Sequence, residues 1–250
     1  FSENRTILFS THVVEDLARQ GVQRIDSPEE LRGGERVIIR SHGEARGVLE
    51  RLQEKNAQII NSTCPKVLRI QKLVQDAEKE GRIPLIIGEI QHPEVLGVAG
   101  WCRNPLIFQG PESLKNWLKA DPGRASLPLS VVSQTTCTQK LFEICTEILK
   151  KEWTNLKIFD TICDATYKRQ SEAAEIAAKV DAIIVVGDRQ SANTRHLTEI
   201  CSGICPAVFQ IERADELPLE DLKRYDTVGL TAGASTPARI IKEVYTTMSE

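Results

Sequence analysis

The sequence lacks three features that would each restrict its class: a long apolar run, a strong charge of one sign and a CxxC pair of cysteines. Its longest apolar stretches, such as residues 182–186 (AIIVV), are far too short to span a bilayer, so we expect no membrane segment. The formal net charge is only −3, which argues against an extended nucleic-acid surface. No low-complexity segment or long linker interrupts the chain.

What is present is the composition of a globular protein. The 250 residues are 41% hydrophobic and 27% charged, which suits one large α/β domain or two to three small ones. The chain begins at Phe1 without an initiator Met, and its opening FSENRTILFS is neither a signal peptide nor a clean domain start. We therefore expect that an N-terminal segment is missing.

Seven cysteines are present, at positions 64, 102, 137, 145, 163, 201 and 205. Because the number is odd and the chain is not small, we expect no disulfide scaffold. Free buried thiols, metal ligands and a metal cluster are the alternatives. The composition is that of an intracellular enzyme, which we expect in the cytoplasm.

Four stretches share one layout, in which an apolar strand runs into a small polar motif that opens a helix. They are 37–45 (VIIRSHGEA), 84–95 (PLIIGEIQHPEV), 182–194 (AIIVVGDRQSANT) and 227–238 (TVGLTAGASTPA). Apolar residues at three-to-four spacing predict helices over 44–55, 66–81, 138–153, 167–180, 193–203 and 237–248. Further strands are predicted at 57–61, 105–108, 128–133, 157–160 and 206–211. Strands that alternate with helices indicate parallel α/β layers.

Polar side chains gather where these strands end. Ligands of parallel α/β sheets bind outside the carboxyl ends of the strands, and helix N-termini attract phosphate. The pattern therefore predicts a site for a phosphorylated small molecule. Its candidate residues are His42, His92, Glu94, Ser191, Asn193 and Ser235.

Each of these residues also has a structural explanation. A histidine can be a hydrogen-bonded structural residue, but two at two strand ends favour donors to phosphate. The serines and Asn193 can cap helices, which is compatible with binding phosphate. Glu94, in the first turn of a predicted helix, can favour the helix dipole or act as a general acid.

Two cysteines stand at corresponding points, since Cys64 and Cys163 each follow a strand and precede a helix. A thiolate is favoured near a helix N-terminus, so both are candidate ligands, and the alternative is a buried structural cysteine. We interpret Cys201 and Cys205 (CSGIC) as structural and Cys145 as core, whereas Cys137 follows the hydroxyl cluster SQTT at 133–136.

The ordered set of motifs resembles one family, 4-hydroxy-3-methylbut-2-enyl diphosphate reductase or LytB, over about the whole chain. The matching pieces are SHG (His42), STCP (Cys64), QHPEVLGVAGW (His92, Glu94), SQTT (Thr135, Thr136), ICDATYKRQ (Cys163), VVGDRQSANT (Ser191, Asn193) and VGLTAGASTP (Ser235). Single pieces are weak, but the ordered set is specific.

The resemblance implies a trefoil of three small α/β units around a central cavity. We place the units at 1–63, completed by 236–250, at 64–162 and at 163–235. It also implies an iron–sulfur cluster, 4Fe–4S or 3Fe–4S, held by three cysteines of which Cys64 and Cys163 match two. The iron without a protein ligand takes the substrate hydroxyl.

The resemblance also assigns roles to the other residues. Glu94 matches the proton donor, and Thr135 matches the hydroxyl that places the substrate alcohol. The diphosphate is held by residues that match His42, His92, Thr136, Ser191, Asn193 and Ser235.

The chain departs from the family at three points. It has no segment like the Gly-Phe-Cys-Gly that carries the family's first cysteine. Phe9 stands at the position of the family's first diphosphate histidine, with His12 out of register. Ala192 stands where the family often has a second serine. We interpret the first two departures as truncation or alteration of the N-terminus.

The resemblance predicts reductive removal of the hydroxyl of 4-hydroxy-3-methylbut-2-enyl diphosphate, giving isopentenyl and dimethylallyl diphosphate. Its electrons would come from a ferredoxin- or flavodoxin-type donor, and neither a nucleic acid nor a membrane is an expected partner. Two alternatives stay open: a non-catalytic phosphate-ligand binding protein on the same scaffold, and a zinc hydrolase that uses His42, His92 and Cys64.

Overall fold

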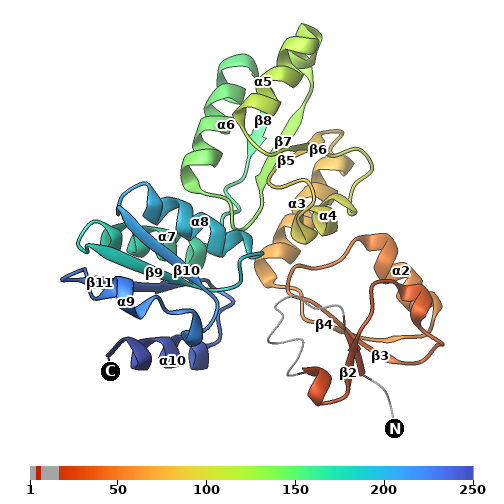
Figure 1. Ribbon diagram of the computed structural model, residues 1–250. Coiled ribbons are helices and arrows are strands. Elements are labelled where there is room, and N and C mark those ends of the chain that lie inside the picture. Colours follow the sequence, from red (N-terminus) through yellow and green to blue (C-terminus); the bar gives the residue numbers. More distant parts are fainter. Residues whose placement is uncertain (1–3, 7–16, 250) are drawn as a thin grey trace. The chain divides into compact units, whose positions relative to one another are not determined.

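The computed structural model describes residues 4–6 and 17–249, and Figure 1 shows their ribbon. Phe9 and His12 lie outside the described residues. The described strands form three sheets, and every strand pair in them is parallel. The predicted α/β class with three parallel-sheet units is therefore confirmed.

The first sheet has the strand order β2-β1-β3-β4. Its strands are β1 (Asn4–Thr6), β2 (Val22–Arg24), β3 (Arg36–Ile39) and β4 (Gln58–Asn61), with a short 3-10 helix η1 (Pro28–Glu30) after β2. Helix α2 (Arg46–Glu54) connects β3 to β4 and packs Leu52 on Val37 and Ile39. We did not predict β1 or β2, since three residues each are too few to show an apolar alternation.

The second sheet has the strand order β6-β5-β7-β8. Its strands are β5 (Ile83–Ile87), β6 (Leu106–Phe108), β7 (Leu129–Ser133) and β8 (Leu156–Ile158). Its helices are α3 (Pro65–Lys79), α4 (Pro93–Ala99), α5 (Pro111–Ala120) and α6 (Gln139–Glu152), with the 3-10 helix η2 (Pro122–Ser126).

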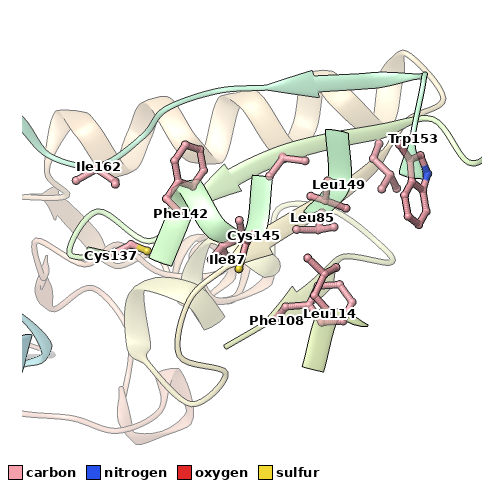
Figure 2. Packing of buried hydrophobic residues seen from close by; sticks show 12 residues of the cluster. Leu85, Ile87, Phe108, Leu114, Cys137, Phe142, Cys145, Leu149, Trp153 and Ile162 are labelled. Carbon is pink, nitrogen blue, oxygen red and sulfur yellow. The ribbon is translucent and has the colours of Figure 1, made fainter. Parts of the chain in front are cut away.

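Successive residues of β5 point to opposite faces of the second sheet, as the period of a strand requires. Leu85 and Ile87 belong to the core that α5 and α6 cover, which Figure 2 shows from close by. Ile86 belongs instead to the core that α3 and α4 cover. Because helices cover both faces, β5 and β7 are apolar on both sides, as parallel strands usually are.

The third sheet has the strand order β10-β9-β11. Its strands are β9 (Ala182–Val186), β10 (Ala207–Ile211) and β11 (Val228–Ala232). Helices α7 (Asp164–Ala177) and α8 (Ala192–Ser202) pack on one face, whereas α10 (Ala238–Ser249) and the short α9 (Leu219–Leu222) pack on the other. The 3-10 helix η3 (Ala214–Glu216) follows β10.

The chain divides into two compact units, Phe1–Ile162 with the first two sheets and Cys163–Glu250 with the third. Residues 236–250 differ from our expectation, because they belong to the second unit and not to the first sheet. Ile240 and Val244 of α10 are buried with Ile184 and Val186 of β9, which explains this placement. The other expected unit boundaries stay a prediction.

The predicted helices and strands agree with the structure to within a few residues at each end. The exception among the longer elements is α5 (Pro111–Ala120), which we did not predict. A search of the described residues found no helix with the length and apolar character that crossing a membrane requires.

Candidate active site

Glu94 and Thr135 meet at the carboxyl ends of two neighbouring strands. Glu94 lies in the first turn of α4, after β5, and Thr135 follows β7. The register pairs Ile87 of β5 with Ser133 of β7, so the segments that follow leave the sheet side by side. The parallel sheet thus brings together two side chains that are 41 residues apart.

The contact between the two residues holds the carboxyl group by both oxygens. The backbone N–H of Thr135 donates to Oε1 of Glu94 at 2.6 Å, and the Thr135 hydroxyl donates to Oε2 at 2.6 Å. Glu94 is only 2% exposed, and this burial raises the pKa of its carboxyl group, while the bonds from Thr135 act to lower it. The site therefore contains a fixed carboxyl group that favours its proton, as a general acid requires.

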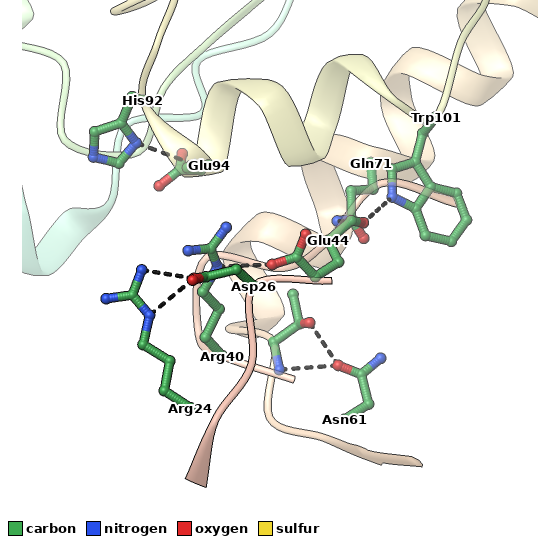
Figure 3. A network of polar contacts seen from close by, with 10 residues as sticks. Arg24, Asp26, Arg40, Glu44, Asn61, Gln71, His92, Glu94 and Trp101 are labelled. Carbon is green, nitrogen blue, oxygen red and sulfur yellow. Dashed lines mark hydrogen bonds and ion pairs between the residues drawn. The ribbon is translucent and has the colours of Figure 1, made fainter. Parts of the chain in front are cut away.

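His92 is the N-cap residue of α4, two residues before Glu94. Its Nδ1 accepts a hydrogen bond of 3.1 Å from the backbone N–H of Glu94, as Figure 3 shows. In the neutral imidazole the proton is then on Nε2, which becomes the donor. The prediction that Glu94 lies in the first turn of a helix is confirmed by the same cap.

His42 lies beside His92, although it follows a strand of another sheet. The two ring centroids are 5.5 Å apart with an edge-to-face orientation. Burial lowers the pKa of His42 to about 4, with smaller contributions from His92 and Arg40. Near neutral pH this imidazole is uncharged and presents one N–H donor.

Thr136 and Gln134 complete the segment after β7. The amide nitrogen of Gln134 donates to the Thr136 hydroxyl at 2.8 Å, and the amide oxygen of Gln134 accepts from the backbone N–H of Glu89 at 3.0 Å. Gln134 is buried and holds the turns after β5 and β7 together. The sequence reasoning missed Gln134, although it stands inside the SQTT motif.

Cys64 and Cys163 occupy equivalent positions in their units. Each is the N-cap residue of a helix, α3 and α7, and neither side chain makes a capping hydrogen bond. Both are half-buried and free of disulfides. Cys64 also packs against the apolar cluster that contains Val95 and Val132. Val95 directly follows Glu94, and Val132 lies three residues before Thr135.

Four other cysteines are poor candidate ligands. Burial raises the pKa of Cys102 and Cys137 to about 12, and of Cys145 and Cys201 to about 11, which favours the thiol over the thiolate that metals need. Cys137 and Cys145 lie in the core of Figure 2, as predicted for Cys145. Cys201 and Cys205 are buried beside α7 and α8, which agrees with a structural role.

Cys64 and Cys163 are each of the residue type that fits an iron–sulfur cluster, since thiolates are its protein ligands. Both residues stand at a helix N-terminus. Among residues 4–6 and 17–249 no three His, Cys, Asp or Glu side chains are grouped closely enough to hold a metal ion.

In the second unit, Ser191, Asn193 and Ser235 follow two neighbouring strands, β9 and β11. Ser191 is the N-cap residue of α8, and its hydroxyl accepts from the backbone N–H of Thr194 at 3.5 Å. Asn193 is 4% exposed, yet neither its amide oxygen nor its amide nitrogen has a partner within the described structure. An unsatisfied buried amide is unfavourable, so both amide groups of this side chain are available to a ligand or a water molecule. Ser235 is exposed in the turn before α10.

The backbone near these residues is crowded. Gly187 has a φ of +151°, and a Cβ there would stand 2.7 Å from the Thr194 hydroxyl and 2.8 Å from that of Thr236. The Thr236 hydroxyl donates to the carbonyl of Val186 at 3.0 Å. These contacts fix the start of the turn that leads to Ser191.

The predicted site residues thus fall into two groups. The first unit contains His42, Cys64, His92, Glu94, Thr135 and Thr136, and the second contains Cys163, Ser191, Asn193 and Ser235. The histidines meet each other, and Glu94 meets Thr135. Ala192, which follows Ser191, is buried.

Comparisons with known proteins agree with one another. The sequence profile described as LytB protein matches residues 4–249. A protein of Caldanaerobacter subterraneus named 4-hydroxy-3-methylbut-2-enyl diphosphate reductase is 42% identical over 241 residues, which are 95% of this chain and 82% of that protein. A protein of the same name from Clostridioides difficile is 35% identical over 96% of this chain and 85% of its own length.

Solved structures are similar as well. One, titled as (E)-4-hydroxy-3-methyl-but-2-enyl diphosphate reductase, the terminal enzyme of the non-mevalonate pathway, has a TM-score of 0.70 and 30% identity and covers 99% of this chain and 88% of its own. The structure of the E-1-hydroxy-2-methyl-but-2-enyl-4-diphosphate reductase from Plasmodium falciparum has a TM-score of 0.92 and covers 100% of this chain and 79% of its own, but its 24% identity supports the fold alone. With the profile match over nearly its whole length and relatives this similar, the chain belongs to the LytB protein family.

Proposed function

We propose that this chain is a 4-hydroxy-3-methylbut-2-enyl diphosphate reductase. It removes the allylic hydroxyl of its substrate and gives isopentenyl and dimethylallyl diphosphate. The reaction takes two electrons and two protons, breaks the carbon–oxygen bond, and releases one water for each hydroxyl removed. The observation that carries the proposal is the buried Glu94 whose two oxygens are held by Thr135, close in sequence to a paired histidine donor.

Glu94 supplies protons. Its raised pKa keeps a proton available, and general acids of this kind contribute about 10²–10⁴-fold to a rate. When Glu94 is protonated, its Oε2 can donate to the Thr135 hydroxyl, which can pass a proton toward the leaving oxygen. Thr135 in this way places the substrate alcohol and connects it to the acid.

The diphosphate is bound by neutral donors. His42 and His92 each offer one ring N–H to the diphosphate. Thr136, Ser191, Asn193 and Ser235 add hydroxyl and amide donors, and the N-terminus of α8 adds free backbone N–H groups. Asn193 gains the partners that the described structure lacks.

Cys64 and Cys163 would hold an iron–sulfur cluster, 4Fe–4S or 3Fe–4S. When bound, such a cluster supplies electrons one at a time and an iron that acts as a Lewis acid. The trefoil arrangement around a cavity, the unit boundaries at 63/64 and 162/163, a ferredoxin- or flavodoxin-type donor and a cytoplasmic location are parts of the same proposal. They rest on the family resemblance and on composition.

The test is a turnover assay on protein prepared without oxygen. Iron, zinc and acid-labile sulfide are measured first, and 4-hydroxy-3-methylbut-2-enyl diphosphate is then added with a chemical reductant. We expect iron and sulfide in comparable amounts and formation of both five-carbon diphosphates. A colourless, iron-free protein that binds the substrate unchanged would favour a non-catalytic binder, and zinc without sulfide would favour a hydrolase.

A further inference from the structure

The short helix α4 carries His92 and Glu94 at its N-terminal end and contacts a neighbouring turn toward its C-terminal end. His92 caps its N-terminus, and Gly100 and Trp101 follow its C-terminus. The neighbouring turn is residues 42–45, which carries His42 and leads into α2. The single helix α4 therefore contacts the segments of both histidines.

Two glycines let the turn approach the backbone of α4. A Cβ at Gly97 would stand 3.1 Å from the carbonyl oxygen of Gly43 and 3.5 Å from that of His42. A Cβ at Gly100 would stand 2.9 Å from the Cα of Ala45 and collide with its Cβ. The carbonyl of Gly100 also accepts the first backbone N–H of α2, from Arg46, at 3.4 Å. No side chain larger than hydrogen fits these positions without moving the turn.

A hydrogen bond from Trp101 fastens the turn in this place. The indole Nε1–H donates to the backbone carbonyl of Glu44 at 2.9 Å, and the amide of Gln71 approaches the same oxygen at 3.5 Å (Figure 3). The side chain of Glu44 forms a 2.9 Å ion pair with Arg40, and both side chains are largely buried. The turn is thus held on both sides, two residues from His42.

We propose that Trp101, together with Gly97 and Gly100, is a positioning device that sets His42 at its distance from His92 and so sets the affinity for the diphosphate. The inference rests on the proposed function only for the identity of the ligand. The device acts on the geometry of two donors and touches no reacting atom. Because both histidines bind the diphosphate equally before and during the reaction, its loss raises KM and leaves kcat nearly unchanged.

Trp101→Phe removes the donor and keeps an aromatic ring. We expect the Kd for inorganic pyrophosphate and the KM for the substrate to rise about two- to tenfold, the effect of one hydrogen bond, with kcat within about twofold. Trp153→Phe is the matched control, since its indole N–H donates to the carbonyl of Leu127 at 3.1 Å in the core of α5 and α6. It should lose stability without any change of Kd or KM.

A second pair tests the glycines. Gly100→Ala must displace the turn, so it should raise the Kd for pyrophosphate and the KM for the substrate. Gly110→Ala is the control, because its Cβ would stand at an ordinary 3.6 Å from Leu141, and it should leave both constants unchanged. Pyrophosphate affinity is measured by calorimetry on the iron-loaded protein, and a thermal melt checks that each variant is folded.

The outcomes separate this inference from the proposed function. A wild-type protein without turnover ends the proposed function, while the pyrophosphate affinities still decide the positioning role. Wild-type affinity and KM in both Trp101→Phe and Gly100→Ala would overturn the inference. So would an equal loss in Trp153→Phe, or a wild-type protein that does not bind pyrophosphate.

Discussion

Thr135 donates two hydrogen bonds to one buried carboxylate, from its backbone N–H to Oε1 of Glu94 and from its hydroxyl to Oε2, each at 2.6 Å. The two bonds fix the plane of the carboxyl group and oppose part of the effect of its burial. A rigid acid with a raised pKa results, and its direct contact is a hydroxyl that can relay a proton.

Thr135→Val should slow turnover about tenfold or more and shift its pH dependence. The substitution removes the hydroxyl bond that lowers the pKa of Glu94, so the pKa of this carboxyl group rises further. The part of the kcat profile that depends on a protonated Glu94 then extends to higher pH. Thr146→Val removes another buried hydroxyl, bonded to Glu143 in α6, and should leave the profile unchanged. An unshifted profile in Thr135→Val would contradict the effect of the hydroxyl on the pKa of Glu94, and unchanged turnover would contradict the relay.

The free energy of unfolding should depend on pH through Glu94. Its folded pKa is raised, so its contribution to stability is complete below the carboxyl group's ordinary pKa and is lost as pH rises through the folded pKa. Glu94→Gln removes this loss. In chemical denaturation, the stability of Glu94→Gln relative to the wild type should increase with pH by up to about 1.4 kcal/mol per pH unit. A constant difference would argue against the raised pKa.

His42 should produce the opposite dependence. Its pKa is lowered to about 4, so its contribution is complete above about 6.5, its ordinary value, and is lost as pH falls through about 4. The loss amounts to about 3 kcal/mol over that range. The wild type should therefore lose this contribution on acidification, whereas His42→Asn has no such contribution to lose. The difference in free energy of unfolding between the two proteins should become smaller as the pH falls. Parallel curves would show that His42 titrates as an exposed histidine does.

Cysteine substitutions test the proposed ligands. Cys64→Ser and Cys163→Ser should each lower the iron and sulfide content of anaerobic protein to less than about half, because cluster ligation needs thiolates. Cys201→Ala is the control, since this thiol of α8 is buried against α7 and has a raised pKa. Full iron content in either serine variant would remove that cysteine from the ligand set.

The sequence was sufficient for the repeating strand–helix units, because runs such as 182–186 and the apolar spacing of α3 or α6 are local patterns. Helix α5 was missed although Leu114, Trp117 and Leu118 have helical spacing, since no recognisable strand-end motif precedes it. It lies after β6, in a segment whose only strong local signal is the Pro111 that begins the helix.

The candidate residues were predictable one by one, but their contacts were not. Glu94 and Thr135 meet because β5 pairs with β7 in one register, which no local pattern determines. The contact between Gly97 and Gly43 depends in the same way on how two sheets pack within the first unit. Gln134 and Trp101 were overlooked because their roles exist only through those contacts.

The most direct test of the account compares product formation by the wild type and by Glu94→Gln at equal iron content. The account predicts that the wild type forms isopentenyl and dimethylallyl diphosphate, and that Glu94→Gln keeps its iron and its pyrophosphate affinity but forms both products at least about a hundredfold more slowly. Equal rates in the two proteins would contradict it.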